Sequence, residues 1–177
     1  MPGPRAHARW WIVDADDDAL PDDVDFAEWH LEHIFLKTRD GSESRVTRKS
    51  QPGLTTYHHR VQGALVDGEQ AVHERTLSLR EFRALAKNAD PARASIRKTR
   101  RAFLWDNEYY LLDTFVAPKS AAGTQTLFVE SEKRDAAPPP FLRLVEDVTT
   151  TKWFSSHDDD YGRTMALAEE VTGRRHP

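Results

Sequence analysis

The chain has 177 residues, 38% of them hydrophobic and 31% charged, with a formal net charge of −4 at pH 7. Its 5 Trp, 4 Tyr and 8 Phe are too many for a disordered chain, and a domain of this length can bury a sizeable core without disulfides or a structural metal. The absence of cysteine excludes disulfide frameworks, cysteine-zinc sites and thiol nucleophiles, and the negative charge argues against general nucleic-acid binding.

The sequence contains no segment typical of membrane insertion or secretion. No apolar run approaches the roughly 20 residues that span a bilayer. Near the N-terminus, the apolar run WWIV at residues 10–13 is followed by four Asp within five residues, whereas a signal peptide needs a longer apolar stretch. We therefore expect a cytoplasmic protein without a membrane partner.

Most of the chain alternates between apolar and polar residues with a period of two. Turn residues such as Asp40-Gly41 and Asp106-Asn107 separate the alternating segments, and this combination is typical of strands joined by hairpins. The predicted strands are residues 9–13, 29–37, 44–49, 54–62, 70–77, 95–105, 108–116 and 126–131.

One helix is predicted between the fifth and sixth strands. Ser78 and Glu81 have the spacing of a capping box, and apolar residues then recur at helical spacing until Asp90-Pro91. After a Pro-rich connector at 136–140, residues 141–145 and 164–171 are predicted as short terminal helices.

These elements predict a single domain over residues 1–177 of the α+β class, with mainly antiparallel strands and peripheral helices. We expect the strands to form a barrel over about residues 9–132, because closure removes exposed sheet edges. A C-terminal linker and helices would occupy about residues 133–177.

Charged residues are interleaved with apolar ones on the later strands. Lys98 and Arg100 share one face of their strand, whereas Arg97 and Arg101 lie on the other. Asp113 and Glu130 also have large apolar neighbours on their own faces. A charge directed into a barrel must be paired, liganded or hydrated. The alternative is that these residues point outward and form ordinary charged surface.

The histidine pairs do not have metal-chelating geometry. His30 and His33 point to opposite faces of a strand, as do the neighbours His58 and His59. His58 shares its face with Arg60, so it is a candidate to line the same surface as that arginine.

The segment IRKTRRAF at 96–103 resembles the I-x-K-T-R-Y strand of the CYTH superfamily, which comprises class IV adenylate cyclases, thiamine triphosphatases and related triphosphate tunnel metalloenzymes. Other segments resemble further motifs of that superfamily in the same order, over residues 9 to 157. They are LEHIFL at 31–36, SRVTR at 44–48, ERTLSLREF at 74–82, YLLDTF at 110–115, FVE at 128–130, PFL at 140–142, EDVT at 146–149 and KWFSS at 152–156.

The resemblance implies an eight-stranded antiparallel barrel forming an open tunnel, in which basic residues hold a triphosphate and acids hold Mg²⁺ or Mn²⁺. These residue types suit phosphoryl chemistry, because guanidinium groups match phosphate oxygens and carboxylates are hard-metal ligands. The implied ligand is tripolyphosphate, a nucleoside triphosphate or thiamine triphosphate. The implied phosphate-binding residues are Arg45, Arg60, Lys98, Arg100 and Lys152, and the implied metal ligands are Glu74, Asp113 and Glu130.

The chain departs from the superfamily pattern mainly by lacking acids. The two first-strand glutamates align with Arg5 and His7, and Leu111 and Phe128 occupy two further acidic positions. Thr47 replaces an arginine. The missing acids argue against a complete metal site. Two functions remain open: a weakly active, metal-dependent triphosphate hydrolase, and a catalytically degenerate module that senses phosphate or nucleotide or docks a protein.

Overall fold

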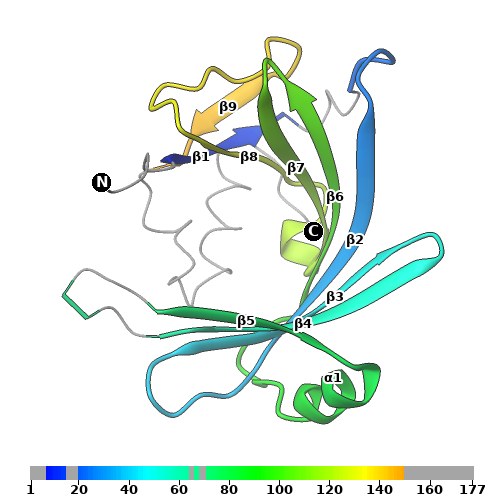
Figure 1. The fold of residues 1–177 in the computed structure, drawn as a ribbon, viewed down its shortest axis with the longest axis vertical. Helices are drawn as coiled ribbons and strands as arrows, with labels where there is room; N and C mark the ends of the chain where they lie inside the picture. Colours follow the sequence, from blue (N-terminus) through cyan, green and yellow to red (C-terminus); the bar gives the residue numbers. More distant parts are fainter. Residues whose placement is uncertain (1–6, 15–19, 64–65, 68–70, 150–177) are drawn as a thin grey trace. The chain divides into compact units, whose positions relative to one another are not determined.

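The computed structural model describes residues 7–14, 20–63, 66–67 and 71–149. Its strands follow the linear order β5-β4-β3-β2-β6-β7-β8-β1-β9 in one sheet, with one α-helix (Figure 1). The strands are β1 (His7–Val13), β2 (Phe26–Phe35), β3 (Glu43–Gln51), β4 (Leu54–Gln62), β5 (Val72–Leu77), β6 (Ile96–Trp105), β7 (Glu108–Ala117), β8 (Gln125–Ser131) and β9 (Leu144–Asp147); the helix is α1 (Leu79–Ala86). The pairs β1–β8, β1–β9, β2–β3, β3–β4, β4–β5 and β7–β8 are antiparallel, which confirms the predicted α+β, mainly antiparallel class.

The chain divides into two compact units. Unit 2 comprises residues 29–98 and carries β3, β4, β5, α1 and most of β2; unit 1 comprises the rest of the chain. Within the described residues, no helix combines the length and apolar character needed to cross a bilayer.

Helix α1 covers one face of the unit 2 sheet (Figure 1). Val46, Tyr57 and Leu77 come from three neighbouring strands and pack against Phe82 of the helix. The rings of Tyr57 and Phe82 lie 4.9 Å apart between centroids. Successive residues of a strand point to opposite faces of the sheet. The strand residues next in sequence to Val46, Tyr57 and Leu77 therefore point away from the helix.

The predicted capping box starts α1. The Glu81 amide donates to the Ser78 hydroxyl at 3.2 Å, and the Ser78 amide donates to the Glu81 carboxylate at 2.7 Å. The hydrogen bonds from Ser78 and the ion pair with Arg75 lower the pKa of Glu81 to about 2. Two amide donors at the end of the helix are thereby satisfied.

Ser78→Ala is expected to reduce the free energy of unfolding by about 1 kcal/mol, because it removes one acceptor of the helix cap. Since the pKa of Glu81 falls from its ordinary 4.5 to about 2, its stabilising effect is complete above pH 4.5 and is lost as the pH falls towards 2. Denaturant unfolding between pH 5 and 2 measures both effects. Glu81→Gln should flatten this pH dependence, and an unchanged slope would contradict the assignment.

The core of unit 1 lies on one face of β1, β7 and β8. Trp11, Leu127 and Leu112 are neighbours on this face and are almost completely buried. Phe103 of β6 stacks on Tyr110 with 5.6 Å between ring centroids. The hairpin between β6 and β7 turns at Asp106 and Asn107, whose φ angles of 47° and 60° are those of a type I′ turn.

The segment predicted as a Pro-rich connector packs on this core. Ala136 is buried within it, and the carbonyl of Ala137 accepts a 2.7 Å hydrogen bond from the Tyr110 hydroxyl. The segment is therefore part of unit 1 rather than a simple spacer.

The prediction of a helix at 141–145 is wrong, because residues 144–147 form β9 and pair with β1. This pairing gives nine strands where eight were predicted. The helix predicted at 164–171 lies outside the described residues. Residues 144–147 pair with the edge of β1, so this long-range contact decides their structure and local propensity does not.

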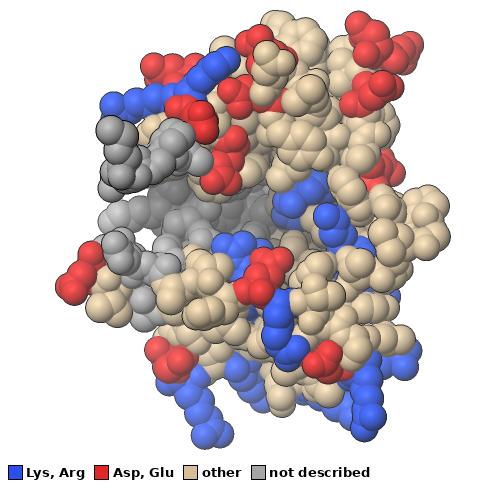
Figure 2. Space-filling view, viewed as in Figure 1, with Lys and Arg blue, Asp and Glu red and all other residues tan. Residues whose placement is uncertain are grey.

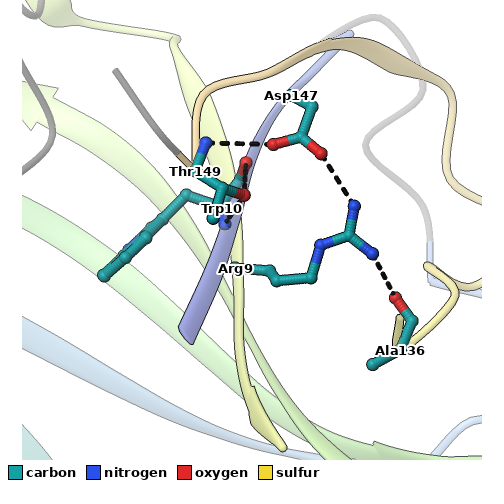
Figure 3. Close-up of polar contacts among 5 residues, drawn as sticks. All are labelled: Arg9, Trp10, Ala136, Asp147 and Thr149. Atoms are coloured by element: carbon teal, nitrogen blue, oxygen red, sulfur yellow. Dashed lines mark hydrogen bonds and ion pairs between the residues drawn. The ribbon is translucent and has the colours of Figure 1, made fainter. Parts of the chain in front are cut away.

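Polar contacts fix β9 beside β1 (Figure 3). Arg9 donates to the Asp147 carboxylate at 2.7 Å and to the carbonyl of Ala136 at 2.9 Å. The Thr149 amide also donates to Asp147, at 3.0 Å. Burial alone would raise the pKa of Asp147, but the hydrogen bonds from Thr149 and Arg9 outweigh it and lower this pKa below its usual 3.8.

Candidate anion site

Two arginines lie directly opposite each other in unit 2. The register of β3 and β4 pairs Arg45 with Arg60, and the register of β4 and β5 pairs Arg60 with Glu74. Paired residues share a face, and Val46, the neighbour of Arg45, packs under α1. Arg45 and Arg60 therefore lie on the face that α1 does not cover, which we call the arginine face.

Neither guanidinium group forms an ion pair within 4.0 Å with a residue that the structure describes. The Nε atoms of Arg45 and Arg60 are buried and have no hydrogen-bond partner there. Glu74 lies opposite Arg60 in the register, yet no ion pair within 4.0 Å joins them. Like charges directly opposite each other destabilise a sheet, and an unpaired buried donor costs free energy. A bound anion would remove both costs.

The row of residues next to the arginine pair on the arginine face consists of a threonine and two histidines. His33, Thr47 and His58 lie side by side on β2, β3 and β4. The Nδ1 atom of His33 is 2.8 Å from the hydroxyl oxygen of Thr47, and the Nε2 atom of His58 is 3.0 Å from that of Thr56. The face thus offers hydrogen-bonding groups beside the arginine pair, on the side towards the turn between β3 and β4.

Unit 2 as a whole is basic although the chain is acidic. Its residues 29–98 contain 13 Lys and Arg against 8 Asp and Glu, a net charge of +5, so the remaining residues carry −9. On the face seen in Figure 2, Lys and Arg side chains gather over the elements of unit 2. This segregation draws anions towards the unit that carries the arginine pair.

In unit 1, the predicted phosphate ligand Arg100 binds the predicted metal ligand Asp113. The Nε and Nη2 atoms of Arg100 donate to the two carboxylate oxygens of Asp113 at 2.7 and 2.8 Å. Asp113 is 6% exposed, so this is a nearly buried, bidentate ion pair. The pair satisfies both charges internally, unlike the arginine pair of unit 2.

The other predicted site residues lie in varied surroundings. Lys98 is buried on β6, and Arg97 beside it is exposed, as the strand alternation predicts. Arg101 donates to Glu28 at 2.9 Å. Glu130 is exposed on β8. Lys152 lies outside the described residues.

The register corrects the alignment of the first strand. His7 pairs with Ser131, whereas Ala8 pairs with Glu130. His7 therefore lies on the face opposite to Glu130 and Asp113. The residues that share the face of Glu130 are Ala8, Trp10 and Ile12, none of which is acidic.

The described residues do not assemble a metal centre. No group of three or more acidic or histidine side chains is close enough together among them to hold an ion. Both oxygens of Asp113 already accept hydrogen bonds from Arg100, and the first strand adds no carboxylate beside Glu130. This donor set does not fit Mg²⁺ or Mn²⁺ binding, and the metal-ligand roles of Glu74, Asp113 and Glu130 stay predictions.

Sequence reasoning gave Arg45 and Arg60 as separate candidates and did not predict that they face each other. The turn residues Pro52-Gly53 were the available signal. A short hairpin centred on Pro52-Gly53 pairs residues whose numbers sum to 105, which makes Arg45 the partner of Arg60.

No protein-family model matches the chain, and no curated protein matches its sequence. Among solved structures, it is similar to the PH1819 protein of Pyrococcus horikoshii OT3, with 10% identity over 95% of this chain and 88% of that one and a TM-score of 0.51. It also matches HpAC1 of Hippeastrum, a candidate adenylyl cyclase described as having a dominant triphosphatase activity, with 11% identity over 73% of this chain and 81% of that one and a TM-score of 0.49. At these identities the likeness concerns the fold alone.

Proposed function

We propose that this protein binds a phosphate-rich anion of the triphosphate class through Arg45 and Arg60 on the arginine face. The observation that carries the proposal is the pair of directly opposite arginines whose buried Nε atoms have no hydrogen-bond partner among the described residues. Planar guanidinium donors match phosphate oxygens, and two of them side by side suit an anion with several oxygens. The sequence resemblance to the CYTH superfamily supports the same ligand class, which includes tripolyphosphate, nucleoside triphosphates and thiamine triphosphate.

We further propose that the protein binds this anion without rapid hydrolysis. Phosphoryl transfer depends on charge neutralisation, which metal-binding carboxylates normally organise. Here Asp113 is held by Arg100, and the first-strand face beside Glu130 carries Ala8 and Trp10. These contacts favour a binding module over a metal-dependent hydrolase.

Thermal unfolding with tripolyphosphate, ATP or thiamine triphosphate tests this function. A ligand at 100 times its Kd is expected to stabilise the protein by about 2.7 kcal/mol. The stabilisation should persist in EDTA, and phosphate release in Mg²⁺ should stay at the uncatalysed rate. Stabilisation only with a divalent ion, together with steady turnover, would establish the hydrolase instead.

A further inference from the structure

A histidine lies next to the arginine pair and has no role in the function proposed above. His58 is two residues before Arg60 on β4, so the two side chains share the arginine face. It lies directly opposite Thr47, which is two residues after Arg45 on β3. The half-buried imidazole therefore occupies the row beside the two guanidinium groups, and its Nε2 atom lies 3.0 Å from the hydroxyl oxygen of Thr56.

The charged groups that face His58 are mostly cations. Arg60 lies on its own strand, and Arg45 and Lys49 lie on β3 at diagonal positions. On the other side, β5 contributes Glu74 diagonally and Thr76 directly opposite. The charges of α1 do not face the imidazole, because the helix packs on the opposite side of the sheet.

These neighbours set the sign of the coupling between protonation and ligand binding. Without an anion, an imidazolium at this position would add a fourth positive charge beside three cations and one carboxylate. With a polyanion on the arginine pair, the same imidazolium becomes favourable, since it would donate a charge-assisted hydrogen bond. Imidazole changes charge between about pH 5 and 8, so this exchange falls in the physiological range.

We propose that His58 is a third anion-contacting residue of the site and that the anion binds together with a proton taken up by this imidazole. The inference rests on the proposed function, because it needs an anion on Arg45 and Arg60. It defines the ligand as a highly charged anion, and the contribution of His58 to its affinity increases as the pH falls. The terminal phosphate of the ligand itself titrates in the same range and has the opposite effect on affinity.

Calorimetry with tripolyphosphate at pH 6 and pH 8 tests the inference, with wild type and His58→Gln compared at each pH. The comparison at a fixed pH cancels the titration of the ligand. At pH 6 the wild type should bind about tenfold more tightly than His58→Gln, since a charge-assisted hydrogen bond is lost, and at pH 8 the two should differ less than about twofold. Titrations in buffers of different ionisation enthalpy should show greater proton uptake by the wild type at pH 6. Sulfate, whose charge is constant over this range, should give the same trend.

His59→Gln is the matched control. His59 is the next residue of β4 but points to the other face, where its Nε2 atom lies 2.9 Å from the Ser44 hydroxyl oxygen. This substitution should leave the affinity at both pH values unchanged. His58→Asn provides a second test variant, and circular dichroism confirms that each variant is folded.

The possible results separate the inference from the function on which it rests. If the wild type binds, and Arg60→Ala removes binding, but His58→Gln weakens it equally at both pH values or not at all, the proton coupling is wrong and the anion site stands. If the wild type binds neither tripolyphosphate nor sulfate at pH 6 or 8, the anion site itself is wrong.

Discussion

Replacing either Arg45 or Arg60 with alanine is expected to weaken tripolyphosphate binding by about 10- to 100-fold. A charge-assisted hydrogen bond to an enclosed anion contributes about 1.5–3 kcal/mol, which corresponds to this range of affinity. Both Nε atoms are buried and belong to directly opposite residues, so alanine at either position removes a donor that the anion would contact. Isothermal titration calorimetry at fixed salt measures the effect.

Arg48→Ala and Arg75→Ala are the matched controls for this experiment. These arginines lie on β3 and β5 but point to the other face, and they pair with Glu32 and Glu81. Their removal should change the affinity less than about threefold, because exposed charges contribute little at moderate ionic strength. Equal losses in all four variants would indicate diffuse attraction by the basic unit and no specific site.

Arg45→Ala and Arg60→Ala should not reduce the free energy of unfolding in an anion-free buffer. Arg45 and Arg60 repel each other and have no ion-pair partner among the described residues, so removing one of them relieves repulsion. Opposite effects on stability and on binding distinguish a ligand site from a structural pair.

Asp113→Asn is expected to reduce the free energy of unfolding by about 2–3 kcal/mol. Removing one partner of a buried ion pair leaves the other charge unpaired, which costs about 3–5 kcal/mol when both partners are fully buried. The cost is smaller here because the Arg100 side chain is 28% exposed. Denaturant unfolding measures the change, and the double variant Arg100→Met/Asp113→Asn should recover part of it.

Stability measured with and without EDTA distinguishes an ion pair at Asp113 from a metal site there. If Asp113 serves mainly to pair Arg100, EDTA should leave the stability of the wild type unchanged. Asp147→Asn is the control substitution, because the Asp147 side chain is 44% exposed and its loss should cost less than about 1 kcal/mol. A loss of stability in EDTA that Asp113→Asn abolishes would show that this carboxylate binds a metal.

Local patterns in the sequence predicted most of the elements. The alternation of apolar residues located β3, β4, β6, β7 and β8 to within a few residues, and Ser78 with Glu81 marked the start of α1. These signals are local, since the strand period, the turn residues and the helix cap each depend on a few neighbouring side chains.

The site was less predictable because it depends on contacts between strands. The bidentate contact of Arg100 with Asp113 and the exposure of Arg97 follow from pairing, which the residue types alone do not specify. The face of the first strand was assigned to the wrong parity, since an alignment shift of one residue exchanges the two faces. A helix was predicted at 141–145, where β9 begins at Leu144, because the edge that pairs with β9 belongs to β1, which is distant in sequence.

The most direct test of the anion site is a nitrogen-detected titration of the arginine Nε–H groups with tripolyphosphate. Among the described residues, the Nε atoms of Arg45 and Arg60 are buried donors without a hydrogen-bond partner, so their resonances report occupancy of the site itself. We predict that these two signals shift together and saturate with the calorimetric Kd, while those of Arg48 and Arg75 stay unchanged. Signals of Arg45 and Arg60 that do not move at saturating tripolyphosphate would contradict an anion between them.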